Sequence, residues 1–238
     1  MQVIHWGSRV LGTCLVAILF LQSASSRAQF FVPRSQVEDF GAPLGAAPLS
    51  PPPPISPLGI GLIKDFEGWQ PIAYDDPAGY CTIGYGHLIA KQKCSQVSLE
   101  DEFRGTWSLD KGNDRLEIDT RTSRAAVQRL VTRELEDYQF SALSSFVFNV
   151  GKENFAGSTL LQLINDGDLQ IARNEFAKWV MSKGRVYKGL QDRRACEAAL
   201  FSNGLEGRQG KFERVECVSL GAAPSTQSLI DIDVGEKK

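Results

Sequence analysis

Residues 56 to 87 carry the pattern that most limits how this 238-residue chain can fold. Ser56 is a typical helix cap, and the apolar residues after it recur at helical spacing until Gly68, a typical helix end. Residues 72–83 then change to two extended runs, separated by an Asp-Pro-Ala-Gly turn that begins at Asp76. The pattern therefore predicts a helix that leads directly into a small hairpin-based sheet.

Three polar side chains fall where these elements meet. Glu67 lies on the last turn of the predicted helix, Asp76 opens the turn, and Thr82 lies on the returning strand. The negative end of a helix disfavours an ionised carboxylate, which is the direction that a general acid needs. Hydrolysis of a glycosidic bond requires two carboxyl groups, because one protonates the leaving oxygen while the other handles water or the developing cation. The spacing predicts a sugar-cleaving enzyme.

The chain beyond residue 120 shows five further helical signals, beginning at Ser123, Gln139, Ser158, Asp168 and Gly189. Before them, residues 97–120 lose periodicity and accumulate acidic side chains, which favours a long surface insertion.

Four ordered blocks of the sequence resemble the phage-type lysozymes, the endolysin family classed as glycoside hydrolase family 24. They are Glu67 to His87, Gln-Phe-x-Ala-Leu ending in Phe-Asn-Val-Gly at Gly151, Ser-Thr-Leu with Asn165 and Gly167, and Gly-Leu-x-x-Arg-Arg with Glu197 and Phe201. The resemblance covers about residues 57–204 and departs most at 97–120, where the family usually has a helix with apolar positions. It implies a lysozyme-like α+β fold with a small sheet-bearing N-terminal lobe, a mainly helical C-terminal lobe and a saccharide cleft between them.

The resemblance also implies an activity and site residues. The chain would be a muramidase that cleaves the β-1,4 bond between N-acetylmuramic acid and N-acetylglucosamine of peptidoglycan, with lysis of the bacterial cell wall as its role, and the family leans towards inversion. Glu67 would be the general acid, Asp76 would orient water and stabilise the oxocarbenium-like transition state, and Thr82 would hold that water. Asn149 would hydrogen-bond in the cleft and Arg193 would face Glu67 across the lobes. For these last two residues a surface polar group or a structural ion pair is an equal alternative.

Two other functions stay open. A lytic transglycosylase cleaves the same bond with one principal acid, but it does not need the water-positioning pair Asp76 and Thr82. A wall-binding module that has lost catalysis is disfavoured by the intact set of three side chains. No cofactor is expected, and no metal, because His87 is the only histidine outside the first residues of the chain. A net charge of −2 gives no broad basic field, so nucleic acid is not expected as a partner, and the chain is expected to be a monomer.

Residues 1–28 are typical of an export signal, because their apolar run is too short to span a bilayer, where ~20 residues are needed. Ser26-Arg27-Ala28 offers a cleavage site, and a retained membrane anchor is the alternative. In either case the working part is expected outside the cytoplasm, periplasmic or extracellular, with membrane contact only through an uncleaved leader. A proline-rich spacer over 29–56, a catalytic domain over 57–204 and a polar tail over 205–238 are expected to follow.

Cleavage would remove Cys14 and leave four cysteines, Cys81, Cys94, Cys196 and Cys217. An even number in an exported chain indicates two disulfides with three possible pairings. Sequence proximity favours Cys81 with Cys94 and Cys196 with Cys217, and free buried thiols are the alternative. If the leader is retained, Cys14 could exchange with Cys81.

Overall fold

A computed structural model describes residues 50–203, 205, 212–222, 225 and 228–236. The chain divides into two units, residues 1–47 and 48–238, and all described residues belong to the second. The predicted leader, Cys14 and most of the predicted spacer therefore lie outside the described residues. Within the described part of the chain, no helix is long and apolar enough to cross a membrane.

Helix α1 spans Pro57–Glu67, as the sequence predicts. The side chain of Ser56 accepts a hydrogen bond from the amide of Gly59, and so satisfies one of the donors that the first turn of a helix leaves free. The helix ends at Gly68, whose φ of 73° lies in the region that favours glycine. Its apolar face places Leu62 in the core of the helical part.

The predicted sheet is present and has three antiparallel strands in the order β1-β2-β3, which are β1 (Gln70–Asp75), β2 (Cys81–Gly84) and β3 (His87–Ala90). The first two strands form the predicted hairpin around the turn at Asp76, and Tyr74 pairs with Thr82 across it. The third strand is not predicted from the sequence. It begins at His87, whose Nδ1 atom lies 3.0 Å from the carboxylate of Asp119.

The interpretation of residues 97–120 as a surface insertion is wrong for its second half. Helix α2 spans Leu109–Asp119, and Ser108 caps it by accepting a hydrogen bond from the amide of Lys111. Most side chains of this helix are polar, so no helical period is visible in the sequence. Its buried residue Leu116 packs against α1 residues in a small cluster, which shows that tertiary packing supports the helix.

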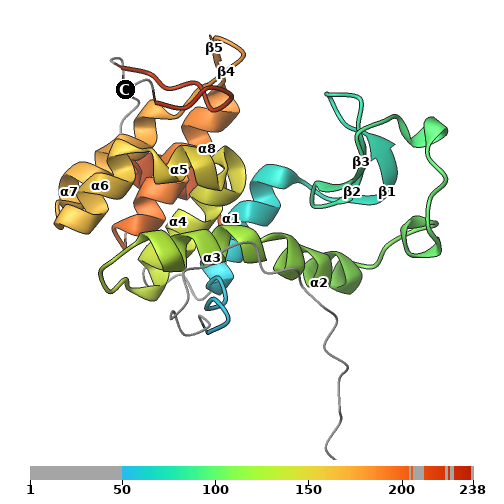
Figure 1. The fold of residues 1–238 in the computed structure, drawn as a ribbon, viewed down its shortest axis with the longest axis horizontal. Helices are drawn as coiled ribbons and strands as arrows, with labels where there is room; N and C mark the ends of the chain where they lie inside the picture. Colours follow the sequence, from blue (N-terminus) through green and yellow to red (C-terminus); the bar gives the residue numbers. More distant parts are fainter. Residues whose placement is uncertain (1–49, 204, 206–211, 223–224, 226–227, 237–238) are drawn as a thin grey trace, which may run out of the picture. The chain divides into compact units, whose positions relative to one another are not determined.

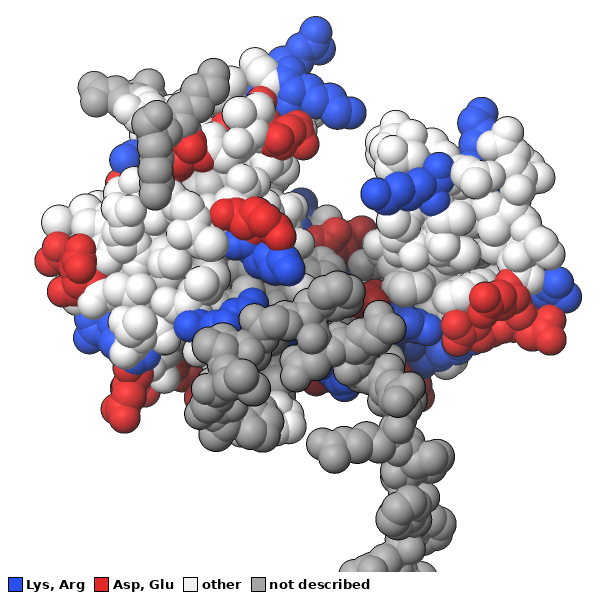
Figure 2. Space-filling view, in the orientation of Figure 1, with Lys and Arg blue, Asp and Glu red and all other residues white. Residues whose placement is uncertain are grey.

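The first half of this segment covers the sheet. It contains a 3-10 helix, η2 (Asp101–Phe103), and a buried cluster in which Phe103 and Trp107 pack with Ile83 of β2. Acidic side chains gather on its outer surface (Figure 2). Cys94, at the start of a second 3-10 helix, η1 (Cys94–Gln96), forms a disulfide with Cys81 of β2.

The remaining helices build the mainly helical part, and they are α3 (Arg121–Leu130), α4 (Asp137–Val150), α5 (Lys152–Ala156), α6 (Thr159–Asp166), α7 (Leu169–Glu175), the 3-10 helix η3 (Phe176–Lys178) and α8 (Lys188–Phe201). Helix α8 packs on α4, which is largely buried (Figure 1). The predicted end of α4 at Gly151 and the predicted cap of α6 by Ser158 are both observed. Helix α5 is not predicted from the sequence. The α+β fold class is confirmed, with the sheet in the N-terminal part.

The described residues beyond 204, expected to form a polar tail, pack on the helical part. Helix α9 (Arg214–Leu220) is joined to α8 by a disulfide between Cys196 and Cys217. Residues 228–236 run beside a small hairpin made of β4 (Met181–Ser182) and β5 (Arg185–Val186). Side chains of this C-terminal region, Leu205, Cys217, Ala222 and Ile230, belong to the main core.

The end of the predicted spacer also contacts the helical part. The guanidinium of Arg124 donates a hydrogen bond of 3.0 Å to the carbonyl of Pro53, and the amide of Ser56 donates one of 2.9 Å to the hydroxyl of Ser141. Ile55 is buried. The proline run therefore leads into the fold along α3 and α4.

Candidate active site

Glu67 is the last residue of α1, and its side chain is 23% exposed. Its Oε1 atom accepts a hydrogen bond of 2.5 Å from Nη1 of Arg193 on α8, 126 residues away in the sequence. Its other oxygen faces the turn at Gly86, where an added β carbon would lie 3.5 Å from Oε2. Glu67 is thus placed between the helical part and the sheet.

Behind Glu67 lies a buried network of charged side chains on α8. Nε of Arg193 donates to Oε1 of Glu197 at 3.2 Å, and the hydroxyl of Ser145 donates to the same oxygen at 2.8 Å. Nε of Arg194 lies 2.9 Å from Oε2 of Glu197. Buried charges are costly unless they are paired, and here two guanidinium groups meet two carboxylates, including that of Glu67.

The electrostatics of the two arginines differ. Burial acts to lower the pKa of Arg193, but the carboxylates of Glu67 and Glu197 outweigh it, so this pKa is raised. Burial lowers the pKa of Arg194 to about 10, and Arg193 adds to the decrease while Glu197 opposes it. Both side chains remain cationic at neutral pH, so Glu67 always faces a positive charge.

Glu67 opens into a cavity of about 630 Å³. The helical side of its wall includes Arg193 and Asn149, whose Oδ1 accepts a hydrogen bond of 2.8 Å from Nη2 of Arg194. Pro77 of the β1–β2 turn lies on the wall as well. The structure therefore brings three of the residues singled out in the sequence into one cavity.

The β4–β5 hairpin forms a further part of this wall. Ser182, Lys183 and Tyr187 contribute to it, and basic side chains gather over the hairpin (Figure 2). The carboxylate of Asp233 accepts hydrogen bonds from the hydroxyl of Ser182 and the amide of Lys183, while Asp231 accepts one from the amide of Gly184. The C-terminal segment thus holds the hairpin in place.

Asp76 lies at the start of the β1–β2 turn, as predicted, directly before Pro77 of the cavity wall. Its Oδ1 atom accepts two hydrogen bonds of 2.8 Å, from the amides of Ala78 and Tyr80. A side chain that binds its own turn in this way fixes the turn and its own orientation together. Asp76 is half-buried, and every one of these contacts is local in sequence.

Thr82 is buried on β2, with 4% of its surface exposed. Its hydroxyl donates a hydrogen bond of 3.1 Å to the carbonyl of Tyr80, and Thr82 is not on the wall of the cavity. Opposite Thr82 in the sheet lies Tyr74. The pKa of Tyr74 is raised by burial first, and then by the negative charges of Asp76 and Glu67. The phenol of Tyr74 therefore lies within the electrostatic range of both carboxylates.

Sequence reasoning missed part of this site. The spacing of Arg193, Arg194 and Glu197 places the three side chains on neighbouring turns of one helix, which is a signal for ion pairing. No local pattern marks Tyr74 or the β4–β5 hairpin, because their role depends on contacts with distant segments. In the described part of the chain, no three histidine, cysteine or acidic side chains are grouped so that they could hold a metal ion.

The model of the phage lysozyme family matches residues 64–197 of the chain. The chain is 41% identical over 152 residues to an endolysin of Bacillus phage B103, covering 63% of this chain and 54% of that protein. It is 36% identical over 148 residues to the endolysin of Salmonella phage P22, covering 62% of this chain and 97% of that protein. A SAR-endolysin of Escherichia phage Mu is 42% identical over 129 residues, covering 54% of this chain and 70% of that protein. The chain spans about half the length of the Bacillus phage relatives that it matches.

Solved structures agree in fold. A variant of P22 lysozyme is 35% identical with a TM-score of 0.54, covering 63% of this chain and 99% of that one. The muramidase domain of SpmX from Asticaccaulis excentricus is 33% identical with a TM-score of 0.53, covering 62% and 96%. Residues 64–197, which the family model matches, contain the sheet, the buried arginines and most of the cavity wall.

Proposed function

The chain belongs to the phage lysozyme family, and from that premise we propose that it is a muramidase that cleaves peptidoglycan to lyse bacterial cells. The observation that carries the proposal is the place of Glu67, at a helix end, on the wall of a cavity and bonded to Arg193. A glycan strand is a class of ligand that suits an open cavity of about 630 Å³ whose wall carries both charged and aromatic side chains.

Glu67 acts in this proposal as the general acid. Its Oε1 is bonded to Arg193, so the proton to be donated is carried on Oε2, which faces the sheet. Donation of this proton to the glycosidic oxygen lets the sugar leave as an alcohol while the C1–O bond breaks. Arg193 then stabilises the carboxylate that forms.

Asp76 and Thr82 act on the incoming water. The turn amides orient the Asp76 carboxylate, which accepts a proton as water adds to C1 and stabilises the positive charge that develops there. The Thr82 hydroxyl donates a hydrogen bond to the carbonyl of Tyr80, so its oxygen has lone pairs left to accept a hydrogen bond from that water. Each cleavage consumes one water molecule and forms one new reducing end.

Asn149 and Arg193 are proposed as substrate-binding residues, because both line the cavity beside Glu67. Residues 57–204 are proposed as the catalytic domain, and the protein as a monomer. Two disulfides suit an oxidising compartment, and some relatives are named SAR-endolysins, which supports export to the periplasm or beyond.

The test digests purified peptidoglycan with the wild-type chain and with Glu67→Gln, and identifies the product ends by mass spectrometry. Glu153→Gln is the matched control, because Glu153 is an exposed glutamate on α5, away from this cavity. New reducing muramic ends from wild type and control, and at least about 100-fold fewer from Glu67→Gln, support the proposal. Anhydro ends would instead identify a transglycosylase, and no products from the wild type would leave only a binding module.

A further inference from the structure

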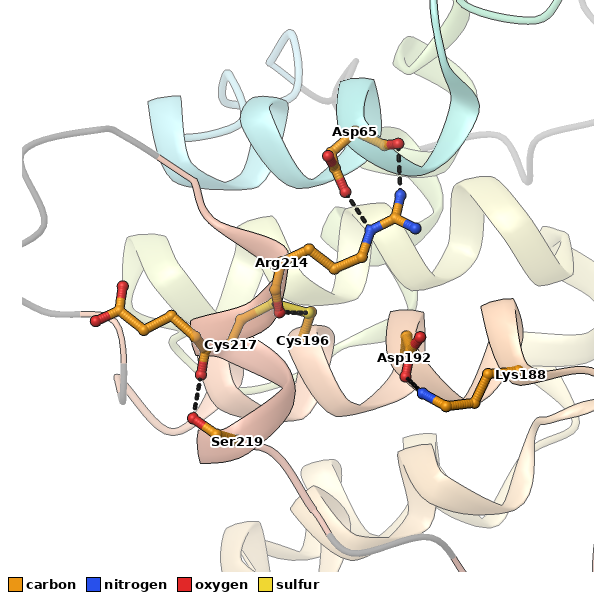
Figure 3. The surroundings of a disulfide bond; sticks show 8 residues. Asp65, Lys188, Asp192, Cys196, Arg214, Cys217 and Ser219 are labelled. Atoms are coloured by element: carbon orange, nitrogen blue, oxygen red, sulfur yellow. Dashed lines mark hydrogen bonds and ion pairs between the residues drawn. A yellow bond between two sulfur atoms is a disulfide. The ribbon is translucent and has the colours of Figure 1, made fainter.

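Helix α9 lies outside the residues that match the family model, yet it contacts the end of α1 that carries Glu67 (Figure 3). Arg214, the first residue of α9, donates two hydrogen bonds to Asp65. Its Nε atom bonds the carboxylate at 2.6 Å, and its Nη2 atom bonds the backbone carbonyl at 2.7 Å. Arg214 also lies on the wall of the same cavity as Glu67.

The backbone bond has a particular consequence for the helix. The last four carbonyls of a helix have no partner within the helix, and Asp65 is among the residues that carry them. A cationic side chain that bonds one of these carbonyls satisfies it and places positive charge at the negative end of the helix. Arg214 therefore caps a carbonyl in the last turn of α1, that of Asp65, two residues before Glu67.

Phe66 links this contact to Arg193. The guanidinium of Arg214 lies 4.2 Å from the centre of the Phe66 ring, and that of Arg193 lies 5.8 Å from it. Phe66 thus contacts the two arginines, and Arg193 holds Oε1 of Glu67. Any displacement of the last turn of α1 changes both contacts.

The segment before α9 fixes α1 further along its length. A β carbon at Gly61 would lie 2.7 Å from Cβ of Phe212, so α1 and this segment pack closely. Helix α9 is also attached to α8, through the disulfide between Cys196 and Cys217 (Figure 3). Helix α9 therefore joins the helix that carries Glu67 to the helix that carries Arg193.

We propose that Arg214 is a positioning residue for Glu67, which acts from α9 by holding the last turn of α1 in the register that places the Glu67 carboxylate on Arg193. The inference rests on the proposed function of Glu67 as general acid. A small misplacement of a catalytic group lowers the rate strongly, whereas the side chains of this ion pair are 41% and 39% exposed and contribute little to stability. A positioning role and a structural role therefore predict different outcomes.

The test compares Arg214→Met with Arg173→Met in the full chain. Arg173 is the matched control, because its guanidinium donates to the carbonyl of Leu220 at the other end of α9 and to the hydroxyl of Ser202 rather than to α1. On purified peptidoglycan we expect kcat to fall about tenfold in Arg214→Met with KM within about twofold, and Arg173→Met to keep the wild-type kcat. Arg214→Lys, which can pair with the carboxylate but not bond both oxygens in the same way, is expected to recover part of the rate.

A second readout does not depend on activity. Hydrogen exchange of the Gly68 amide, which bonds the carbonyl of Lys64 in the last turn, is expected to be faster in Arg214→Met and unchanged in Arg173→Met. The double variant Cys196→Ala and Cys217→Ala is expected to lower kcat in the same direction, and Arg214→Met added to it is expected to lower kcat little further.

The inference is overturned if Arg214→Met keeps the wild-type kcat and Gly68 exchange, or if Arg173→Met loses as much of either. A fall in kcat that follows the unfolding temperature across all variants would also overturn it. If the wild-type chain releases no reducing ends, the proposed function is wrong. The exchange of the Gly68 amide then still shows whether Arg214 holds the last turn of α1.

Discussion

The two carboxylates of the candidate site are placed in opposite ways. Asp76 is oriented by amides two and four residues away in its own turn, whereas Glu67 is bonded to an arginine 126 residues away. The surroundings also differ, since Asp76 lies on a half-exposed turn and Glu67 is backed by the buried charges of α8. In this fold the carboxylate proposed to orient water is positioned by local structure, and the carboxylate proposed as the acid is positioned by the packing of two helices.

Glu197→Gln should have the largest effect, because it breaks the buried charge network behind Glu67. It removes the carboxylate that pairs with Arg193 and Arg194, and leaves two buried guanidinium groups with the single carboxylate of Glu67. Removal of one partner of a buried pair costs about 3–5 kcal/mol. Urea unfolding measures this change in the free energy of unfolding. Glu134→Gln, an exposed glutamate, is the control, and equal stability of the two variants would contradict the role given to Glu197.

Asp76→Asn tests the carboxylate that local structure orients, and it keeps the hydrogen bonds of the turn. An asparagine Oδ1 can still accept from the two turn amides, so the free energy of unfolding should change by less than about 1 kcal/mol. The lost carboxylate should lower kcat about 100-fold, because no base remains for the water. Reducing-end release and urea unfolding together separate the two roles. Wild-type activity in a folded Asp76→Asn would remove Asp76 from the mechanism.

Thr82→Val should have a smaller effect on the rate. Valine keeps the shape of the buried side chain but loses the hydroxyl, which bonds the Tyr80 carbonyl and is proposed to bind water. A loss of about tenfold in kcat is expected, since one neutral hydrogen bond contributes roughly 0.5–1.5 kcal/mol. Thr82→Ser retains the hydroxyl and should keep most of the rate. If serine, which keeps the hydroxyl, loses as much as valine, the loss of rate does not report on the hydroxyl.

Tyr74→Phe should have the smallest effect and reports on the field between the two carboxylates. The pKa of Tyr74 is raised in the folded chain, first by burial and then by Asp76 and Glu67, so folding is opposed by ionisation of this phenol. The stability that the neutral phenol contributes is complete below a pH of about 10, and it is lost as the pH rises through the pKa of Tyr74 in the folded chain. The unfolding temperature should therefore fall less steeply between pH 9 and about pH 11 in Tyr74→Phe than in the wild type. Equal slopes would mean that the pKa of Tyr74 is not raised in the folded chain.

Much of the fold is predictable because its signals are local. Ser56 and Gly68 mark both ends of α1, Asp76 marks the hairpin turn, and Ser158 marks the start of α6, each through bonds within a few residues. Helix α2 is not predictable in this way, because its sequence is polar. The packing of α9 also depends on a segment far away in the chain, because Arg214 bonds Asp65, 149 residues before it.

The sequence by itself determined the α+β class, the positions of Glu67, Asp76 and Thr82 on their elements, and the family to which the four blocks belong. Only the tertiary structure decided that Glu197 balances two buried arginines, and that Arg214 bonds a backbone carbonyl in the last turn of α1. The physical reason is the range of the interactions. The polar groups of caps and turns form hydrogen bonds with residues nearby in the chain. A buried charge is paired only where the fold brings an opposite charge beside it, however distant in sequence.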